Sequence, residues 1–447
     1  FGVNLSDTQS LSLSYDRLKD KGDYYPRPDF GYAYNNAKTG TYTYPTVYTR
    51  NTITLKHKLN LGSSFLLDTT FYSNENELER FEYAGGAGVR PGKIQGLLNG
   101  KVKTIGLNTK AQSNIETGDL LHTLSYGVLY DKQTSKVTWD GDKYGEDEEA
   151  KSINVFVQNA IDFNNGLLLT PGIRFNHYDF DGTYGKIKDN KFTYGLASEY
   201  TVNDNFTLLA SATTLYKGVE MVDVLATNRL SASATNSAGI KAETGINKEI
   251  GFKYIKDNVL GANNIGFSFK YFNTTVKDYI KNEWGPGYAY NYMTNAGDLD
   301  IKGFEANFAF NLENLNTLLS YSKSDTKLKD TNEPLEKDQG DMVSLALDYQ
   351  INSNIDISWN SLFVRTQNDI PSGAAHEKAS YNVHDIAVKW NPNIKGLSVI
   401  AGVDNIFDKT YTSHTSINRL YTLNSAQVVT NDYEPGRNIK ITLAYKF

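Results

Sequence analysis

The side chains best suited to metal or acid–base chemistry are few and scattered along this chain. It contains no cysteine and six histidines, so thiolate chemistry and disulfide frameworks are excluded. No histidine has a second His at the spacing of a metal site. We expect His376 and His414, which lie in polar segments, either to reach a bound ligand or to be solvated loop residues. The other four lie in alternating segments and are predicted to be wall residues: His57, His122, His177 and His384.

Catalytic patterns are lacking. No GxSxG, P-loop or Rossmann pattern occurs in the strand–turn–helix context that would support it. The run Glu146–Glu149 lacks the spacing of a calcium loop, so we expect a solvated loop tip. His384 beside Asp385 comes nearest to a hydrolase pair, but adjacent strand residues point to opposite faces. We therefore expect no enzyme, no catalytic residue, no bound metal ion and no resident cofactor.

Aromatic and cationic residues in the polar segments suit ligand binding better than catalysis. Four aromatic residues stand among Gly and Asn in the segment 281–298, where they could stack on a planar ligand or pack on neighbouring loops. Cations and phenols in other polar segments would bind an anionic ligand. The candidate ligand-binding residues, besides the two loop histidines, are Tyr216, Lys217, Arg229, Trp284, Tyr288, Tyr290, Tyr292 and Arg419.

The elements that would position these residues are β-strands. The closing segment NIKITLAYKF alternates apolar and polar residues to the last position, with Ile439 to Phe447 on one parity. Pairs of alternating runs around short Asn- or Gly-containing turns predict hairpins. The predicted turns are at 164–166, 202–205, 351–354 and 391–396, and further strands are predicted in SLSLSYDRL, NIGFSFKYF, GFEANFAFNL and TLLSYSKS.

Short turns alternate with long polar segments along the chain. The long segments are 140–151, 217–244, 281–298 and 411–437. This asymmetry is typical of an outer-membrane β-barrel, which has short periplasmic turns and long external loops. A soluble all-β protein is the alternative, but the chain lacks the 40–50-residue repeat of a propeller and the tight connections of a sandwich.

Composition agrees with a barrel. The 447 residues have a mean hydropathy of −0.48 and no run of about 18 apolar residues, which excludes a helical membrane protein but not a barrel. Aromatic residues make up 13%, with 31 Tyr, a side chain that suits membrane interfaces. The net charge of −6 argues against a nucleic-acid partner.

Four segments of the C-terminal half resemble motifs of TonB-dependent outer-membrane receptors. The resemblance lies in their order as well as their residues, and the earlier part of the chain is similar mainly in strand pattern. The segments are NSAGIKAETGINKEIGFKY (236–254), IKGFEA (301–306), GVDNIFDKTY (402–411) and YEPGRNIKITLAYKF (433–447).

The resemblance implies a transmembrane antiparallel barrel of 22 strands whose lumen is filled by an N-terminal plug. Such receptors lie in the outer membrane of Gram-negative bacteria, surrounded by lipid. They bind an iron complex outside the cell and import it when a TonB-type periplasmic partner pulls on the plug. The plug is not found in this sequence, which at about 20–25 residues per strand supplies roughly 18–20 strands. We therefore expect a barrel domain over residues 1–447, without the plug and the first few strands.

The resemblance implies a ferric siderophore or haem as the cargo. The segment 211–225 occupies the place of a "FRAP"-type motif in haem receptors, but here it carries Tyr216-Lys217-Gly218, and no His lies between His177 and His376. We therefore favour a ferric siderophore. Haem, a host iron or haem protein as partner, and a passive porin of about 16–18 strands remain as alternatives.

The barrel interpretation also explains the closing strand. We expect it to pair on both edges in a closed barrel, with Ile439 and its parity facing lipid and Asn438 and Lys440 facing the lumen.

Overall fold

The computed structural model describes twelve stretches of the chain. They are residues 1–24, 43–83, 94–144, 146–183, 185–221, 239–259, 261–284, 291–335, 338–416, 420–423, 426–429 and 432–446.

The described residues form strands, turns and connections. None of them belongs to a helix long and apolar enough to cross a membrane. The strands are β1 (Gly2–Ser6), β2 (Gln9–Tyr24), β3 (Tyr44–Asn60), β4 (Phe65–Tyr83), β5 (Ile94–Thr117), β6 (Leu120–Trp139), β7 (Asp142–Lys143), β8 (Glu148–Asp162), β9 (Leu167–Gly182), β10 (Gly185–Asn203), β11 (Phe206–Lys217), β12 (Glu243–Val259), β13 (Ala262–Lys277), β14 (Ile280–Trp284), β15 (Asn291–Asn295), β16 (Leu299–Leu312), β17 (Leu315–Leu328), β18 (Asp341–Asn352), β19 (Ile355–Val364), β20 (Tyr381–Trp390), β21 (Leu397–Asp404), β22 (Leu420–Leu423), β23 (Ala426–Val429) and β24 (Asn438–Tyr445).

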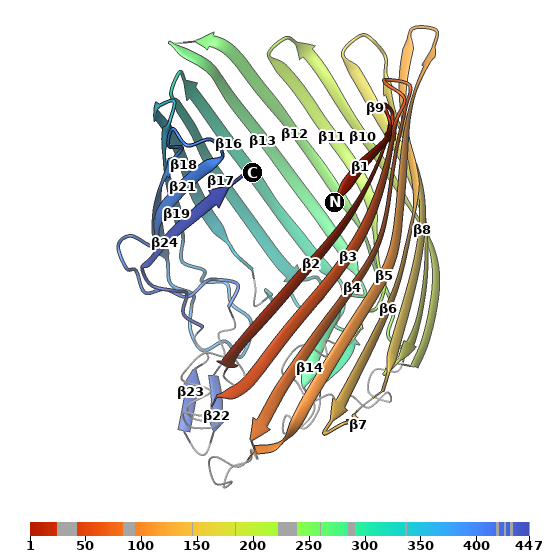
Figure 1. The fold of residues 1–447 in the computed structure, drawn as a ribbon, viewed down its shortest axis with the longest axis vertical. Helices are drawn as coiled ribbons and strands as arrows, with labels where there is room; N and C mark the ends of the chain where they lie inside the picture. Colours follow the sequence, from red (N-terminus) through yellow and green to blue (C-terminus); the bar gives the residue numbers. More distant parts are fainter. Residues whose placement is uncertain are drawn as a thin grey trace.

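One 20-stranded antiparallel sheet contains all the long strands, and Figure 1 shows it as a tall curved wall. Each long strand pairs with the next long strand along the chain, from β1–β2 through to β21–β24. The two small sheets, β14–β15 and β22–β23, are hairpins within long connections. The prediction of an antiparallel β-barrel architecture with roughly 18–20 strands is confirmed.

The two ends of this sheet are β1 and β24. Within the described stretches, β24 pairs only with β21, and β1 pairs only with β2. Pairing of the closing strand on both edges therefore stays a prediction, and Phe447 lies outside the described residues.

The predicted hairpins are confirmed. Short turns join β8 to β9, β10 to β11, β18 to β19 and β20 to β21, and Asn164 and Gly166 of the first turn have positive φ angles of 53° and 89°. The longer connections join the opposite ends of the strands. Figure 1 shows β7, β14, β22 and β23 gathered at that end of the wall.

Three segments expected to be loops contain strands. In 140–151, β8 begins at Glu148, which is 3% exposed and accepts a hydrogen bond from the Thr183 amide at 3.2 Å. Glu149 binds Lys132 at 2.8 Å and Lys151 at 2.5 Å, so only part of the acidic run is a solvated tip. The segments 281–298 and 411–437 contain the two small hairpins. Local patterns do not predict the β14–β15 hairpin because a two-stranded hairpin is marginally stable alone, and here its Met293 packs with Ala150, Phe180 and Val219.

Apolar side chains line one face of the wall, called here the apolar face. Aromatic rings follow one another across β11, β12, β13, β16 and β17. The centroid distances are 5.4 Å for Phe206–Phe252, 6.1 Å for Phe252–Phe269, 6.0 Å for Phe269–Phe304 and 5.3 Å for Phe304–Tyr321.

The opposite face, called the polar face, carries ion pairs and hydrogen bonds. The Lys270 ammonium lies 3.8 Å from the Glu249 carboxylate and 3.2 Å from that of Glu305. The Ser358 hydroxyl donates to the Asp348 carboxylate. The wall is thus apolar on one side and polar on the other, as the alternation predicts.

The exposure of side chains in β8 shows which face is concave. Ile153, Val155 and Val157 on the apolar face are 39%, 45% and 38% exposed, whereas Asn154 and Phe156 between them are partly buried. Side chains on the inside of a curved sheet converge and shield one another. The polar face therefore lines the interior of the wall.

The apolar parity of β24 continues this pattern. Ile439, Ile441 and Leu443 are 71–73% exposed and lie beside Val403, Ala401 and Val399 of β21, respectively. The even-parity neighbour Lys440 forms an ion pair with Asp404 on the polar face.

Glycine is required where the polar face is crowded. A Cβ on Gly303 of β16 would overlap the Lys323 carbonyl oxygen and the Phe272 ring. A Cβ on Gly266 of β13 would meet only the Ala309 Cβ, at 3.5 Å. The substitution Gly303→Ala should therefore lower the free energy of unfolding by roughly 1–3 kcal/mol through overpacking.

The measurement is the urea midpoint of the barrel in detergent, followed by its heat-dependent shift on gels. Gly266→Ala is the matched control and should change the midpoint little. Equal midpoints for Gly303→Ala and the native chain would contradict this account of the packing.

Candidate ligand-binding site

The end of the wall where the long connections gather is the candidate ligand-binding site. Connections held on a rigid sheet are the usual place for binding residues. Two clusters of described residues organise this end. One lies over β8–β10, and the other joins the connections that follow β17, β19 and β21.

The first cluster covers the polar face near the long-connection ends of β8 and β9. Phe180 and Val219 are 0% and 1% exposed, and they pack with Ala150 and with Met293 of β15. The Tyr178 hydroxyl donates to the Val219 carbonyl oxygen. The segment after β11 and the β14–β15 hairpin are therefore folded onto the inside of the wall.

Tyr216 and Lys217 lie at the end of β11, beside this cluster. The Lys217 ammonium is 2.8 Å from the Glu220 carboxylate and 3.9 Å from that of Glu243. Tyr216 is half-buried, with Asp189 and Tyr178 as its ionisable neighbours. The positive charge of Lys217 is therefore balanced locally, and an anionic ligand would have to compete with Glu220 for it.

Asn295, which the sequence analysis did not single out, fixes the β14–β15 hairpin to the start of β12. Its Nδ2 donates to the Lys241 carbonyl at 3.0 Å and to the Asp278 carbonyl at 2.6 Å, and its Oδ1 accepts from the Lys241 amide at 2.9 Å. The same side chain thus holds backbone on both sides, a role that no local sequence pattern reveals.

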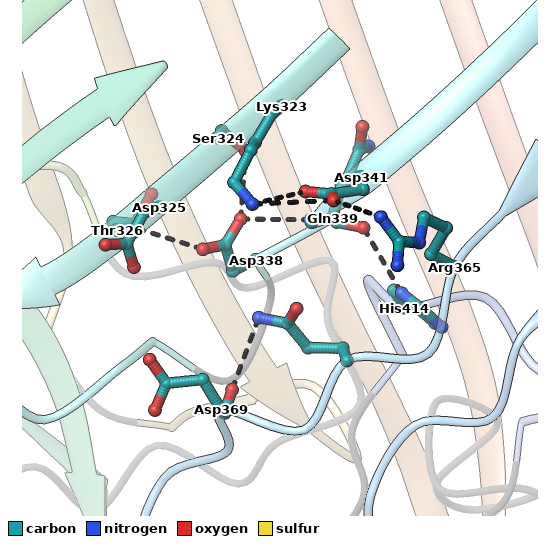
Figure 2. Close-up of polar contacts among 12 residues, drawn as sticks. Lys323, Ser324, Asp325, Thr326, Asp338, Gln339, Asp341, Arg365, Asp369 and His414 are labelled. Atoms are coloured by element: carbon teal, nitrogen blue, oxygen red, sulfur yellow. Dashed lines mark hydrogen bonds and ion pairs between the residues drawn. The ribbon is translucent and has the colours of Figure 1, made fainter. Parts of the chain in front are cut away.

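The second cluster begins with two aspartates before and at the start of β18 (Figure 2). Asp338, 6% exposed, accepts hydrogen bonds from the Ser324 hydroxyl at 3.0 Å and the Thr326 amide at 2.9 Å. Asp341 lies between two cations, 3.2 Å from Lys323 and 3.5 Å from Arg365. These contacts tie β17, β18 and β19 together at their long-connection ends.

His414 joins three connections within the second cluster. Its Nδ1 lies 3.2 Å from the Gln339 carbonyl oxygen and its Nε2 lies 3.1 Å from the Ala379 carbonyl oxygen. The side chain is 2% exposed, and the Lys378 ammonium donates to the His414 carbonyl oxygen. Both ring nitrogens therefore face backbone acceptors, and neither points to open solvent.

Further contacts stiffen the second cluster. Lys327 lies 2.6 Å from Asp369, and this hydrogen bond raises the pKa of the Lys327 ammonium. The Tyr381 and Tyr411 rings stack with their centroids 4.5 Å apart, and burial raises the pKa of both hydroxyls. The two phenols therefore stay protonated at neutral pH.

Some of the other predicted site residues lie in the described stretches and some do not. Arg229, Tyr288, Tyr290 and Arg419 lie outside the described residues. The backbones of Trp284 and Tyr292 lie in β14 and β15, where they pair with Asn291 and Glu283, respectively. His376 is exposed on the connection after β19, and its Nδ1 is 2.8 Å from the Glu377 carbonyl oxygen.

No metal centre is found in the part of the chain that the structure describes. There, no three His, Asp or Glu side chains come together as they would around a metal ion.

Sequence comparison decides the family. The family described as TonB dependent receptor-like, beta-barrel, matches residues 1–406. This chain belongs to that family. The matched range includes the N-terminal strands, whose resemblance to the family lies mainly in their strand pattern. The closing segment 433–447 lies beyond the matched range.

The relatives of this receptor barrel are named for haem and for a siderophore. It is 25% identical over 328 residues to the hemin receptor of Yersinia enterocolitica, covering 65% of this chain and 46% of the relative. It is 24% identical over 339 residues to the ferrienterobactin receptor of Escherichia coli K12, covering 69% of this chain and 41% of the relative. The chain thus spans less than half the length of these curated relatives, which are receptors and not enzymes.

The fold of the receptor barrel is shared with solved structures. The FrpB iron transporter of Neisseria meningitidis (F3-3 variant) superimposes with a TM-score of 0.77 at 20% identity, over 100% of this chain and 70% of that chain. This likeness confirms the barrel architecture.

His414 should be a structural clamp in the receptor barrel. Replacing it with Ala leaves the Gln339 and Ala379 carbonyls without their partner, at a local cost of roughly 1–3 kcal/mol. Hydrogen exchange should therefore speed up in the segments 338–341 and 376–380 while the sheet stays protected. His376→Ala, at an exposed position of the neighbouring connection, is the control, and equal exchange in both variants would refute the clamp.

Proposed function

We propose that this chain is the barrel of an outer-membrane receptor that binds a ferric siderophore in its long external connections. Import through the lumen would be driven by a TonB-type periplasmic partner acting through a plug. The family match carries this proposal, and the distribution of polar and apolar residues on the wall supports it.

The height of the apolar face supports a membrane location. In β8 it runs from Ile153 to Ile161, interrupted by Asn159, and in β9 from Leu167 to Phe175, which matches the roughly 9–11 residues with which a tilted strand crosses a bilayer. Towards the long connections it gives way to charged residues, such as Lys151 in β8. The wall therefore suits an outer membrane of a Gram-negative bacterium, with lipid around the apolar face.

The loop histidines favour a siderophore over haem. An axial haem ligand needs an open imidazole nitrogen, but both nitrogens of His414 face carbonyl oxygens. His376 is the remaining described histidine outside the strands. An anionic chelate needs cations and aromatic surfaces instead, such as Lys217 and the aromatic residues of the β14–β15 hairpin.

Haem stays the alternative cargo because a hemin receptor is among the relatives. Haem binding would require ligation by His376, a tyrosine, or a rearranged connection that releases His414. Direct binding to a host iron or haem protein is compatible with either cargo, and no nucleic acid is proposed as a partner.

The two clusters would have different roles in ligand binding. The second cluster is held together by the hydrogen bonds and ion pairs of Asp338, Asp341 and His414. It would act as a fixed side of the mouth, which is the end of the wall where the long connections gather. The first cluster carries Lys217 and the β14–β15 hairpin, and it would contact the cargo. A fixed side reduces the conformational entropy lost on binding.

Titration of the complete receptor with haem and with a panel of ferric siderophores tests the cargo. We expect saturable quenching of Tyr and Trp fluorescence by one ferric siderophore at submicromolar concentration, and a much weaker response to haem. Binding of haem alone would overturn the siderophore proposal.

A planar-bilayer recording of the same protein tests the receptor against the porin. A plugged receptor should show no steady conductance without its energised partner. Steady open conductance would support a passive porin instead.

A further inference from the structure

A hollow of about 870 Å³ lies on the wall, lined at the middle of β8–β11 and neighbouring strands. It adjoins the first cluster, because its lining reaches Tyr178 and Tyr216, and none of its described lining residues belongs to the second cluster. Its polar lining residues include Lys110, Arg174 and several amides, and no described lining residue is an aspartate or glutamate. That composition is unusual for a chain of net charge −6.

The two cations lie in one row across the wall. The register runs from Lys110 in β5 to Gly127 in β6, Phe156 in β8 and Arg174 in β9. Three strand spacings separate the two cations, or about 14 Å between their backbones. All four positions belong to the polar face, so both cations lie on the interior side of the wall.

An aromatic ring lies between the cations. A Cβ on Gly127 would stand 2.9 Å from the Phe156 ring, so the absence of a side chain at Gly127 leaves room for that ring on the wall. The row next to it places Asn154 opposite Asn176, and both line the hollow. The interior surface thus offers a ring for stacking, amides for hydrogen bonding and a cation on each side.

The nearby carboxylates do not neutralise the cations. Asp68 faces Lys110 across β4 and β5, but no ion pair forms between them in the described structure. Asp131, on the polar face of β6, accepts a hydrogen bond from the Tyr72 hydroxyl. Among the described residues, Arg174 likewise has no ion-pair partner, so the hollow keeps a positive charge.

We infer that this hollow is a binding site for an anionic, aromatic iron chelate on its way through the lumen. Lys110 and Arg174 attract the negative charge, since charge-assisted hydrogen bonds are the stronger kind. The Phe156 ring stacks on a planar ligand group, and Asn154 and Gln158 bind its oxygens. The inference rests on the proposed function and adds to it the charge and aromatic character of the cargo.

Equilibrium dialysis of the complete receptor tests the site. The probe is ferric tris-catecholate, which is anionic and aromatic, and neutral ferric tris-acetohydroxamate is the comparison ligand. The double variant Lys110→Gln/Arg174→Gln should bind the catecholate complex about tenfold more weakly or worse, because it loses two charge-assisted contacts. Binding of the neutral complex should not change.

Lys253→Gln is the matched control, because Lys253 is an exposed cation on the polar face of β12 that does not line the hollow. It should bind the catecholate complex like the native chain, and the urea midpoints of all variants establish that they are folded. Unchanged catecholate binding by the double variant would overturn the site, as would absence of binding to the native receptor.

The outcomes also separate this site from the proposed function. A receptor that still takes up a ferric siderophore while the double variant binds the catecholate complex normally rejects the hollow alone. A lowered midpoint in the double variant with unchanged binding would assign the two cations to contacts with protein carboxylates of the complete receptor. A native receptor that neither binds nor imports any ferric siderophore rejects the proposed function.

Discussion

The backbone ladder between sequence-adjacent strands is the constraint on which the rest of this structure depends. Each long strand between β1 and β24 finds its hydrogen-bond partners in the long strands before and after it, and β1 and β24 each pair on one side within the described stretches. In a bilayer, no water can satisfy a backbone amide, so every strand must be paired along its length. Register then fixes which side chains face inwards, and a shift of one residue would exchange the two faces.

Because register assigns the faces, one sheet performs two tasks. The apolar face carries the aromatic row from Phe206 to Tyr321, and the polar face carries ion pairs such as Lys270 with Glu305. The same alternation puts Lys110 and Arg174 on the interior, in one row with Phe156. The proposed cargo path and the proposed lipid-facing surface would therefore both arise from one repeating pattern.

The two clusters at the mouth are held by different kinds of contact, whereas the wall repeats a single alternation of apolar and polar residues. His414, Asp338 and Asp341 bind backbone or charges from several connections, whereas Lys217 and the β14–β15 hairpin lie on the other cluster. These contacts join residues that are far apart in the sequence. They hold one side of the mouth together, and under the proposed function the other side would contact the ligand.

The sequence by itself determined the strands, the hairpins, the two faces and the family resemblance, because alternation and turn residues act over a few positions. It did not reveal that Glu148 begins a strand, that 281–298 forms a hairpin, or that His414 is buried against Gln339 and Ala379. Those outcomes depend on contacts between connections separated by tens of residues. Only the tertiary structure could decide them, since it sets which polar atoms are buried and which partners they meet.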